Sequence, residues 1–327
     1  MLLEDKMPKQ LLDDMDWEQL CEHVLSKVGH QLKAKEIPTF RRWFIEREKI
    51  GYLFDYIMVL RCFRIWQELK DGLDHFIVIS GREGYGKSTL SFQMAAWINP
   101  NFRLKHITYD AKQYLDLMGE KAEQHVNNQI DYKDIKSESI VMDEGTELLS
   151  KESMNITNRT LTKTFFIQRA LKFLVIINIP NFHMLDSVIR FHRVRTLIEI
   201  IKRGGYKAIT GAGILTVSKE GLPTKQVNSV RLREGQFWHG SYTKKFPNTI
   251  DKQEYEKFKM QQIKICIERL KDDVVGAKMV AAVKVSKHIG CSTDTIVRMI
   301  KEGKVKGKQI GAKWYITRQA YDKLLLT

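Results

Sequence analysis

The feature that most constrains this chain is a run of eight residues, GREGYGKS at 81–88, which matches the phosphate-binding pattern G-x-x-x-x-G-K-[ST]. An apolar run at 76–80 precedes it, and a run with helical spacing at 89–98 follows. Glycines let backbone N–H groups turn toward phosphates without Cβ clashes, and a helix start adds its positive dipole end. We therefore predict a P-loop for ATP or another nucleoside triphosphate, formed by Gly81, Gly84, Tyr85, Gly86, Lys87, Ser88 and Thr89.

Two roles follow from the chemistry of that loop. The Lys87 ammonium would reach the β- and γ-phosphates, and the Ser88 hydroxyl would bind Mg²⁺. A second motif supports this, because the apolar run 139–142 ends in Asp143 and Glu144. Asp143 is predicted to hold Mg²⁺, mostly through water, and Glu144 to orient and deprotonate the attacking water. An ordinary strand end with two solvated acids is the alternative.

A third polar position closes another apolar run, at 173–179. Asn178 stands near its end, where the carboxyl ends of parallel strands line a ligand crevice. Its amide is predicted to bridge the γ-phosphate and the lytic water, although it could instead cap the turn before Pro180. Phosphoryl transfer also calls for a further cation. Arg169 is the first choice and Arg190 the next; the other candidates are Arg159, Arg193 and Arg195, and each could be a surface residue.

Short apolar runs alternate with helical ones from residue 75 onward. The runs at 76–80, 105–109, 139–142, 173–179 and 194–200 predict an α/β fold with a parallel sheet, of the P-loop NTPase type (RecA-like, ASCE). Before it, residues 17–28 and 43–69 have helical spacing, with Pro38 as a breaker. Residues 204–247 predict hairpins and loops. The expected domains are a helical region at 1–74, an ATPase domain at 75–250, a helical linker at 251–272 and a small domain at 273–327.

Charge and cysteine usage limit the environment and the partners. The formal net charge of +15 favours a polyanion such as DNA, although a lysine-rich soluble surface is the alternative. Four cysteines are present, at 21, 62, 266 and 291, and their wide spacing indicates neither a zinc site nor disulfides. The first residues are acidic, unlike a signal peptide, and no apolar run is long enough to span a membrane. We expect a cytoplasmic protein, in the host cytoplasm if it is viral.

The end of the chain has a pattern of its own. Two helices are predicted at 280–289 and 293–301 around the turn Gly290-Cys291-Ser292, followed by a hairpin at 304–316 that turns at Gly311 and a helix at 318–325. This pattern resembles the winged helix-turn-helix domains of phage excisionases and the MerR group. The resemblance implies DNA binding, with Thr293, Asp294, Thr295 and Arg298 in the major groove and Lys304, Lys306, Lys308 and Lys313 on phosphates. A helical protein-binding module is the alternative.

The central region also resembles a known family. The stretch QRALKFLVIINIP at 168–180, with LDSVIR at 185–190 and the run at 194–200, is similar to the FtsK–HerA superfamily of DNA-pumping ATPases, which includes viral packaging ATPases. The similarity covers residues 75–202, and Asn178 departs from the glutamine usual in the family. The resemblance implies a homo-oligomeric ring, often a hexamer, with DNA in its pore.

Three functions are compatible with these features. The first is an ATP-driven motor that translocates or packages DNA for a virus or mobile element. The second is an ATP-dependent replication initiator or helicase loader, and the third is a DNA-binding regulator switched by ATP. A motor predicts ATPase activity that rises with duplex length, a loader predicts modest activity tied to one sequence or partner, and a switch tolerates loss of Glu144.

Overall fold

The computed structural model describes residues 15–51, 54–128, 138–143, 163–165, 171–219, 232–277 and 279–325. The chain divides into two compact units, residues 1–255 and 256–327, which are described separately. Helix α10 (Lys252–Ala277) begins in the larger unit and continues into the smaller one. Within the described ranges, no helix has both the length and the apolar character that a membrane crossing requires.

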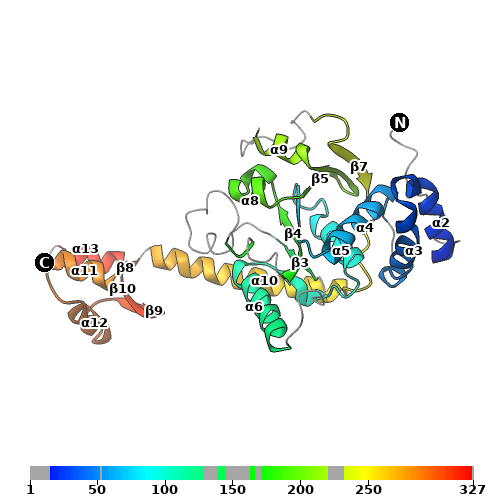
Figure 1. The fold of residues 1–327 in the computed structure, drawn as a ribbon. Coiled ribbons are helices and arrows are strands. Elements are labelled where there is room, and N and C mark those ends of the chain that lie inside the picture. The colour runs from blue at the N-terminus through cyan, green and yellow to red at the C-terminus, as the bar shows by residue number, and fades with distance from the viewer. Residues whose placement is uncertain are drawn as a thin grey trace. The chain divides into compact units, whose positions relative to one another are not determined.

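Helices α2, α3 and α4 form the beginning of the larger unit (Figure 1). Their bounds are Trp17–Val28, Ile37–Ile45 and Tyr56–Lys70, and the 3-10 turns Gly29–Gln31, Ala34–Glu36 and Glu48–Ile50 join them. Asp16 and Asp55 cap α2 and α4, because each carboxylate accepts a hydrogen bond from the backbone N–H three residues further on. Pro38 lies in the first turn of α3, where a missing N–H costs nothing, so the predicted breaker starts a helix.

These helices pack against α5 (Lys87–Ile98), which follows the P-loop sequence. The Trp97 ring lies 5.5 Å from Trp43 and 5.7 Å from Phe44. The buried Arg47 guanidinium donates to the carbonyls of Trp97 (2.8 Å) and Trp43 (2.6 Å), and burial lowers its pKa to about 10. Carbonyls in the last turn of a helix lack partners within the helix, and Arg47 donates a hydrogen bond to one of them. The amino-terminal helices therefore help to hold α5 in place.

A seven-stranded sheet runs through the larger unit in the order β2-β3-β4-β1-β5-β6-β7. The first five strands in this order are parallel, and β6 and β7 are antiparallel to their neighbours. The strands are β1 (His75–Gly81), β2 (Ile107–Thr108), β3 (Ser139–Met142), β4 (Leu174–Ile179), β5 (Thr196–Lys202), β6 (Gly205–Thr210) and β7 (Phe237–Ser241). This mixed α/β architecture with a mostly parallel sheet is compatible with a P-loop NTPase core.

Alternate residues of the sheet enter two separate cores. Ile77 and Ile79 of β1 join the core that contains α5 and the amino-terminal helices, whereas Phe76 and Val78 join the second core. Every residue of β1, β3 and β4 is buried, as expected for parallel strands covered on both faces. The second core includes side chains of α6 (Ala111–Asn127), α8 (Ser187–His192), α9 (Ala212–Lys219) and the 3-10 turn Phe182–Met184. A further 3-10 turn, Leu104–His106, precedes β2.

Helix α9 differs from the sequence-based expectation of hairpins and loops over 204–247. Gly211 has a φ of +55°, which lets the chain turn directly after β6, and the helix then buries Ile214 and Val217 in the second core. The glycines and β-branched residues of this segment favour other structures, so tertiary burial outweighs local propensity here. The hairpin prediction is therefore wrong for residues 212–219.

The smaller unit contains a three-stranded antiparallel sheet, in the order β8-β10-β9, and three short helices beside the end of α10. Its elements are β8 (Met279–Ala281), α11 (Ala282–Ile289), α12 (Thr293–Lys301), β9 (Gly307–Ile310), β10 (Lys313–Thr317) and α13 (Arg318–Leu324). Gly290 ends α11 in the left-handed region (φ 74°), and the Ser292 hydroxyl caps α12. Residues 280–281, predicted as helix, belong to β8 because they pair with β10.

Candidate nucleotide-binding site

The loop between β1 and α5 is shaped by two glycines with little room for a side chain. At Gly81 (φ +143°) a Cβ would lie 2.9 Å from the Ile200 carbonyl oxygen, and at Gly86 (φ +97°) it would lie 2.8 Å from the Tyr242 hydroxyl. That hydroxyl donates a hydrogen bond to the Tyr85 carbonyl (2.7 Å) and so holds the loop. The strand, loop and helix therefore stand in the order that the sequence predicts for a P-loop, with Gly84 exposed at the tip.

Helix α5 presents its amino-terminal end to this loop. Gly86 has no side chain that could cap the helix, so the first N–H groups of α5 donate no hydrogen bond to a capping side chain. Lys87 begins the helix, and its half-buried ammonium donates to the carbonyls of Gly81 (2.8 Å) and Arg82 (3.3 Å). Thr89 is half-buried in the same first turn. The lysine thus spans the loop that it is predicted to serve.

Asp143 connects the loop to the rest of the predicted site. It follows β3 directly and is only 2% exposed. Its Oδ1 accepts hydrogen bonds from the Ser88 hydroxyl (2.7 Å) and the Asn178 amide (2.8 Å), and its Oδ2 accepts one from the Tyr255 hydroxyl (2.6 Å). Three of the predicted residues, Ser88, Asp143 and Asn178, are therefore in direct contact.

The strand order explains this meeting. β4 lies between β1 and β3, and all three strands run in the same direction. Their carboxyl ends share one edge of the sheet, so Asn178 near the end of β4 lies between the P-loop and Asp143. The Asn178 amide nitrogen also bonds the Ser91 hydroxyl (3.0 Å), while its buried Oδ1 has no hydrogen-bond partner within the described part of the chain. The side chain thus points at Asp143, and its oxygen remains as an acceptor at the site.

Tyr255 is a contact that the sequence did not predict. It lies in the first turn of α10, where it packs edge-on against Phe92 (5.0 Å between ring centroids) and beside Phe246 (5.5 Å). Burial, and next the neighbouring Asp143 carboxylate, raise the pKa of Tyr255, so the phenol stays protonated and acts as a donor. No motif marks this residue, because 112 positions separate it from Asp143.

Glu199 is a second residue that sequence analysis missed. It lies on β5 opposite Ser80, and the Ser80 hydroxyl donates to its carboxylate. Burial raises the pKa of Glu199, while the Ser80 hydrogen bond and the charge of Lys87 act in the opposite direction. A signal was present, since a lone acid interrupts the apolar run TLIEII at 196–201. The carboxylate therefore lies one residue from the P-loop, on the neighbouring strand.

The predicted arginines and the predicted base fall into three groups. Glu144, Arg159 and Arg169 lie outside the described residues. Arg190 lies on α8, is 9% exposed, and has two guanidinium nitrogens without hydrogen-bond partners among the residues described. Arg193 pairs with Asp74, and Arg195 lies 3.8 Å from Glu68, so both are engaged near the amino-terminal end of β1. That end of the strand is opposite the P-loop.

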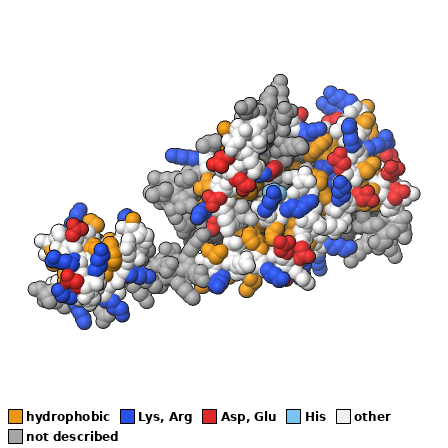
Figure 2. Space-filling model, turned by 90° about the horizontal axis from the view of Figure 1, so that it is seen from below, with side chains coloured by type: hydrophobic (Ala, Val, Ile, Leu, Met, Phe, Trp, Pro, Cys, Tyr) orange, Lys and Arg blue, Asp and Glu red, His pale blue; other side chains and the backbone are white. Residues whose placement is uncertain are grey.

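The predicted DNA contacts lie on the smaller unit. Asp294 and Arg298 of α12 are exposed, whereas Thr293 and Thr295 are half-buried and bond the Ser286 and Ser292 hydroxyls (3.1 and 2.9 Å). The four predicted phosphate-binding lysines, Lys304, Lys306, Lys308 and Lys313, are all exposed. Figure 2 shows basic side chains over the visible face of this unit, with few acidic ones among them. Glu302 neutralises part of this charge, since it pairs with Lys304 (2.8 Å) and lies 3.9 Å from Arg298.

Comparison with known proteins adds little. No family model and no curated protein matches the chain. Among solved structures, the N-terminal domain of zonular occludens toxin from Neisseria meningitidis is similar over 56% of this chain and 98% of its own, with 16% identity and a TM-score of 0.33. We draw nothing from a likeness at that TM-score.

Proposed function

We propose that the chain binds ATP with Mg²⁺ at the loop 81–88 and hydrolyses it. The observation that carries this proposal is the 2.7 Å hydrogen bond between Ser88 and Asp143. It joins the end of the phosphate-loop motif to the acid that follows β3, although 55 residues separate them. Two residues that share one metal ion must lie this close together, and the contact brings the two predicted magnesium ligands into that position.

The donor set fits magnesium. A serine hydroxyl and an aspartate carboxylate are hard oxygen ligands, and magnesium commonly takes one or two protein oxygens and completes its shell with phosphate and water. Bound there, the ion would neutralise charge on the β- and γ-phosphates. Lys87 would exchange the carbonyls of Gly81 and Arg82 for phosphate oxygens, and the free Oδ1 of Asn178 would accept from the attacking water. Glu144 would then take the proton from that water.

The strand order favours an ATPase of the RecA-like, ASCE kind. One strand, β4, separates the P-loop strand β1 from the strand β3 that ends at Asp143. The class is named for an additional strand in this place. Here that strand is β4, and it places the polar side chain of Asn178 between the phosphate loop and the metal-binding acid.

We propose further that the smaller unit binds DNA as a winged helix-turn-helix, and that the whole chain is a DNA motor for a virus or mobile element. The support is the pair α11 and α12 around Gly290, the hairpin β9–β10, and exposed Arg298 with four exposed lysines. A homo-oligomeric ring in the cytoplasm, hexameric in the family that the chain resembles, belongs to this proposal.

The test of the nucleotide site is Lys87→Ala with Lys112→Ala as its control, because Lys112 is exposed on α6 and far from the loop in sequence. We expect Lys87→Ala to lose binding of a fluorescent ATP analogue and to keep its far-UV circular dichroism, while the control behaves like wild type. Wild-type hydrolysis in Lys87→Ala would refute the site.

The test of the motor is the ATPase rate against DNA length and strandedness. We expect the rate to rise with the length of duplex of any sequence. Modest activity that depends on one sequence or on a partner protein would favour an initiator or loader instead. If Glu144→Gln left every DNA-dependent function intact, ATP would act only as a switch.

A further inference from the structure

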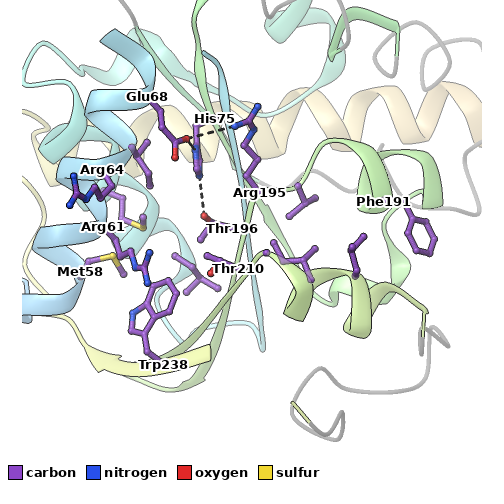
Figure 3. Close-up of a pocket in the computed structure, with 17 residues that line it drawn as sticks. Met58, Arg61, Arg64, Glu68, His75, Phe191, Arg195, Thr196, Thr210 and Trp238 are labelled. Atoms are coloured by element: carbon purple, nitrogen blue, oxygen red, sulfur yellow. Dashed lines mark hydrogen bonds and ion pairs between the residues drawn. The ribbon is translucent and has the colours of Figure 1, made fainter. Parts of the chain in front are cut away.

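A cavity of about 470 Å³ opens in the larger unit, away from the nucleotide site (Figure 3). It is lined by α4, by Met94 of α5, by the first residues of β1 and β5, by the end of β6, by β7 and by α8 and α9. β1 begins at this cavity with His75 and ends at the P-loop with Gly81. At about 3.3 Å per residue the two sites are therefore roughly 20 Å apart, at opposite edges of the sheet.

One wall of the cavity is charged. Glu68 is the acidic residue of the lining, and it is already engaged, because its Oε2 lies 2.8 Å from His75 Nδ1 and 3.8 Å from Arg195. The second nitrogen of His75 bonds the Thr196 hydroxyl (3.0 Å). Arg64 forms an ion pair with Glu36 (2.5 Å), which is not part of the lining. These contacts account for three of the four cationic or imidazole side chains of the lining.

Arg61 is the fourth, and it has no acid. Its guanidinium makes neither a hydrogen bond nor an ion pair with any residue that the structure describes, and it stacks 4.8 Å above the centre of the Trp238 ring. Arg61 is an exposed residue, although partial desolvation of its guanidinium and the nearby charge of Arg64 both lower its pKa. A solvent-accessible cation that rests on an aromatic face and pairs with no described acid can accept an anion.

Much of the remaining lining is apolar. It includes Met58, which lies beside Arg61 on α4, and Met94, Ile198, Ile214 and Leu215, and 47% of the Leu215 surface is exposed. Methionine side chains adapt to ligands of different shape, and an exposed leucine at a rim favours an apolar ligand over water. The cavity is thus divided between one unpaired guanidinium and a hydrophobic surface, and its volume lies in the range of small-molecule sites.

We propose that this cavity binds an amphipathic organic anion. A carboxylate or phosphate head would pair with Arg61, and an apolar body would lie along Met58, Met94 and Ile214. Phosphate alone would gain only the charge contact, and a neutral hydrocarbon only the apolar wall, so both features are needed in one compound. This inference does not rest on the proposed ATPase activity.

The experiment uses the full chain and the fluorescent anion 8-anilinonaphthalene-1-sulfonate as the probe. We expect the probe to bind saturably to the wild-type chain. Arg61→Met should weaken this binding about tenfold, because it removes roughly one charge-assisted hydrogen bond. Arg42→Met, an exposed arginine on α3 that does not line the cavity, should bind the probe like wild type. Equal affinity in wild type and Arg61→Met, or an equal loss in both variants, would overturn the proposal.

Competition then identifies the head group. Dodecanoate and dodecyl phosphate carry the same chain, so the one that displaces the probe at the lower concentration has the preferred head. Inorganic phosphate and dodecanol should displace it poorly. The proposal is wrong if neither amphiphilic anion competes, or if dodecanol competes as well as they do.

A second pair of variants covers the case that Arg61→Met does not fold. Leu215→Glu places a negative charge at the rim of the cavity and should weaken the probe several-fold. Val188→Glu is its control, because Val188 is similarly exposed (43%) and lies outside the lining. Binding of a fluorescent ATP analogue should be unchanged in all these variants, which separates failure here from failure at the P-loop.

Discussion

The nucleotide site and the helix pair of the smaller unit are assembled in opposite ways. Asp143 meets Ser88, Asn178 and Tyr255 across 55, 35 and 112 residues of chain. In the smaller unit, α11 and α12 meet across a turn at Gly290, and the Ser286 and Thr293 hydroxyls in contact there are seven residues apart. The first site needs the whole sheet in order, whereas the second needs mainly a local turn and a small core. Changes in the first should therefore couple to one another, and changes in the second should stay local.

The largest effect is expected for Asp143→Asn. The amide oxygen in the Oδ1 position can still accept hydrogen bonds from Ser88 and Asn178, and the Tyr255 hydroxyl can rotate to accept one from the amide nitrogen. The fold should therefore survive, but the negative charge for magnesium is lost. We expect steady-state ATP hydrolysis to fall about 10²- to 10³-fold. Asp116→Asn on α6, an exposed aspartate, is the control. Near-wild-type hydrolysis in Asp143→Asn would mean that the contacts of Asp143 with Ser88, Asn178 and Tyr255 have a structural role only.

A substitution on α12 should be smaller and confined to DNA binding. Arg298→Ala removes an exposed guanidinium from the helix predicted to enter the major groove, and we expect affinity for the cognate duplex to fall about tenfold. Fluorescence anisotropy measures this, with Lys323→Ala on α13 as the control. Basal ATPase activity should stay at the wild-type value. An equal loss of DNA binding and basal hydrolysis would contradict the contrast between the two regions.

Tyr255→Phe tests whether the hydrogen bond from Tyr255 competes with magnesium for the Asp143 carboxylate. It removes the donor to Asp143 Oδ2 and preserves the contacts of the ring with Phe92 and Phe246. We expect the free carboxylate oxygen to lower the magnesium concentration for half-maximal hydrolysis about threefold, because one hydrogen bond no longer competes. A magnesium titration of the ATPase rate measures it, and Tyr315→Phe in the smaller unit is a control. A higher magnesium requirement would show that Tyr255 positions the carboxylate instead.

The smallest effect is expected at a partly exposed ion pair. Hydrogen bonds from Arg64 and from the Lys33 backbone N–H lower the pKa of Glu36 from 4.5 to about 2. Ionised Glu36 therefore stabilises the fold above about pH 4.5, and this contribution is lost as the pH falls toward 2. We expect Glu36→Gln to lose about 0.5 kcal/mol of unfolding free energy at pH 7 and nothing at pH 2, by urea unfolding. ATPase activity should be unchanged at neutral pH, and a difference in stability that does not depend on pH would contradict this assignment.

Local patterns in the sequence predicted some elements well. The helix at 17–28 and the strand at 139–142 begin and end at the predicted residues, because a capping aspartate and a short run of apolar residues mark them without help from the rest of the chain. The predictions were wrong at α9 and β8, where the decisive partners are remote. Ile214 and Val217 are helical because the second core buries them, and residues 279–281 are extended because they pair with residues 315–317.

The sequence by itself determined the chemistry of the nucleotide site: the glycines of the loop, Lys87 and Ser88 at a helix start, and an acid after an apolar strand are all local in the chain. Only the tertiary structure decided which residues meet. The parallel order that places β4 between β1 and β3 brings Asn178 onto Asp143, and the return of the chain into α10 adds Tyr255. At the other end of these strands, Arg61 of α4 lies over Trp238 and pairs with no acid among the residues described. Such contacts depend on sheet order and on long-range packing, and neither is encoded in any short stretch of residues.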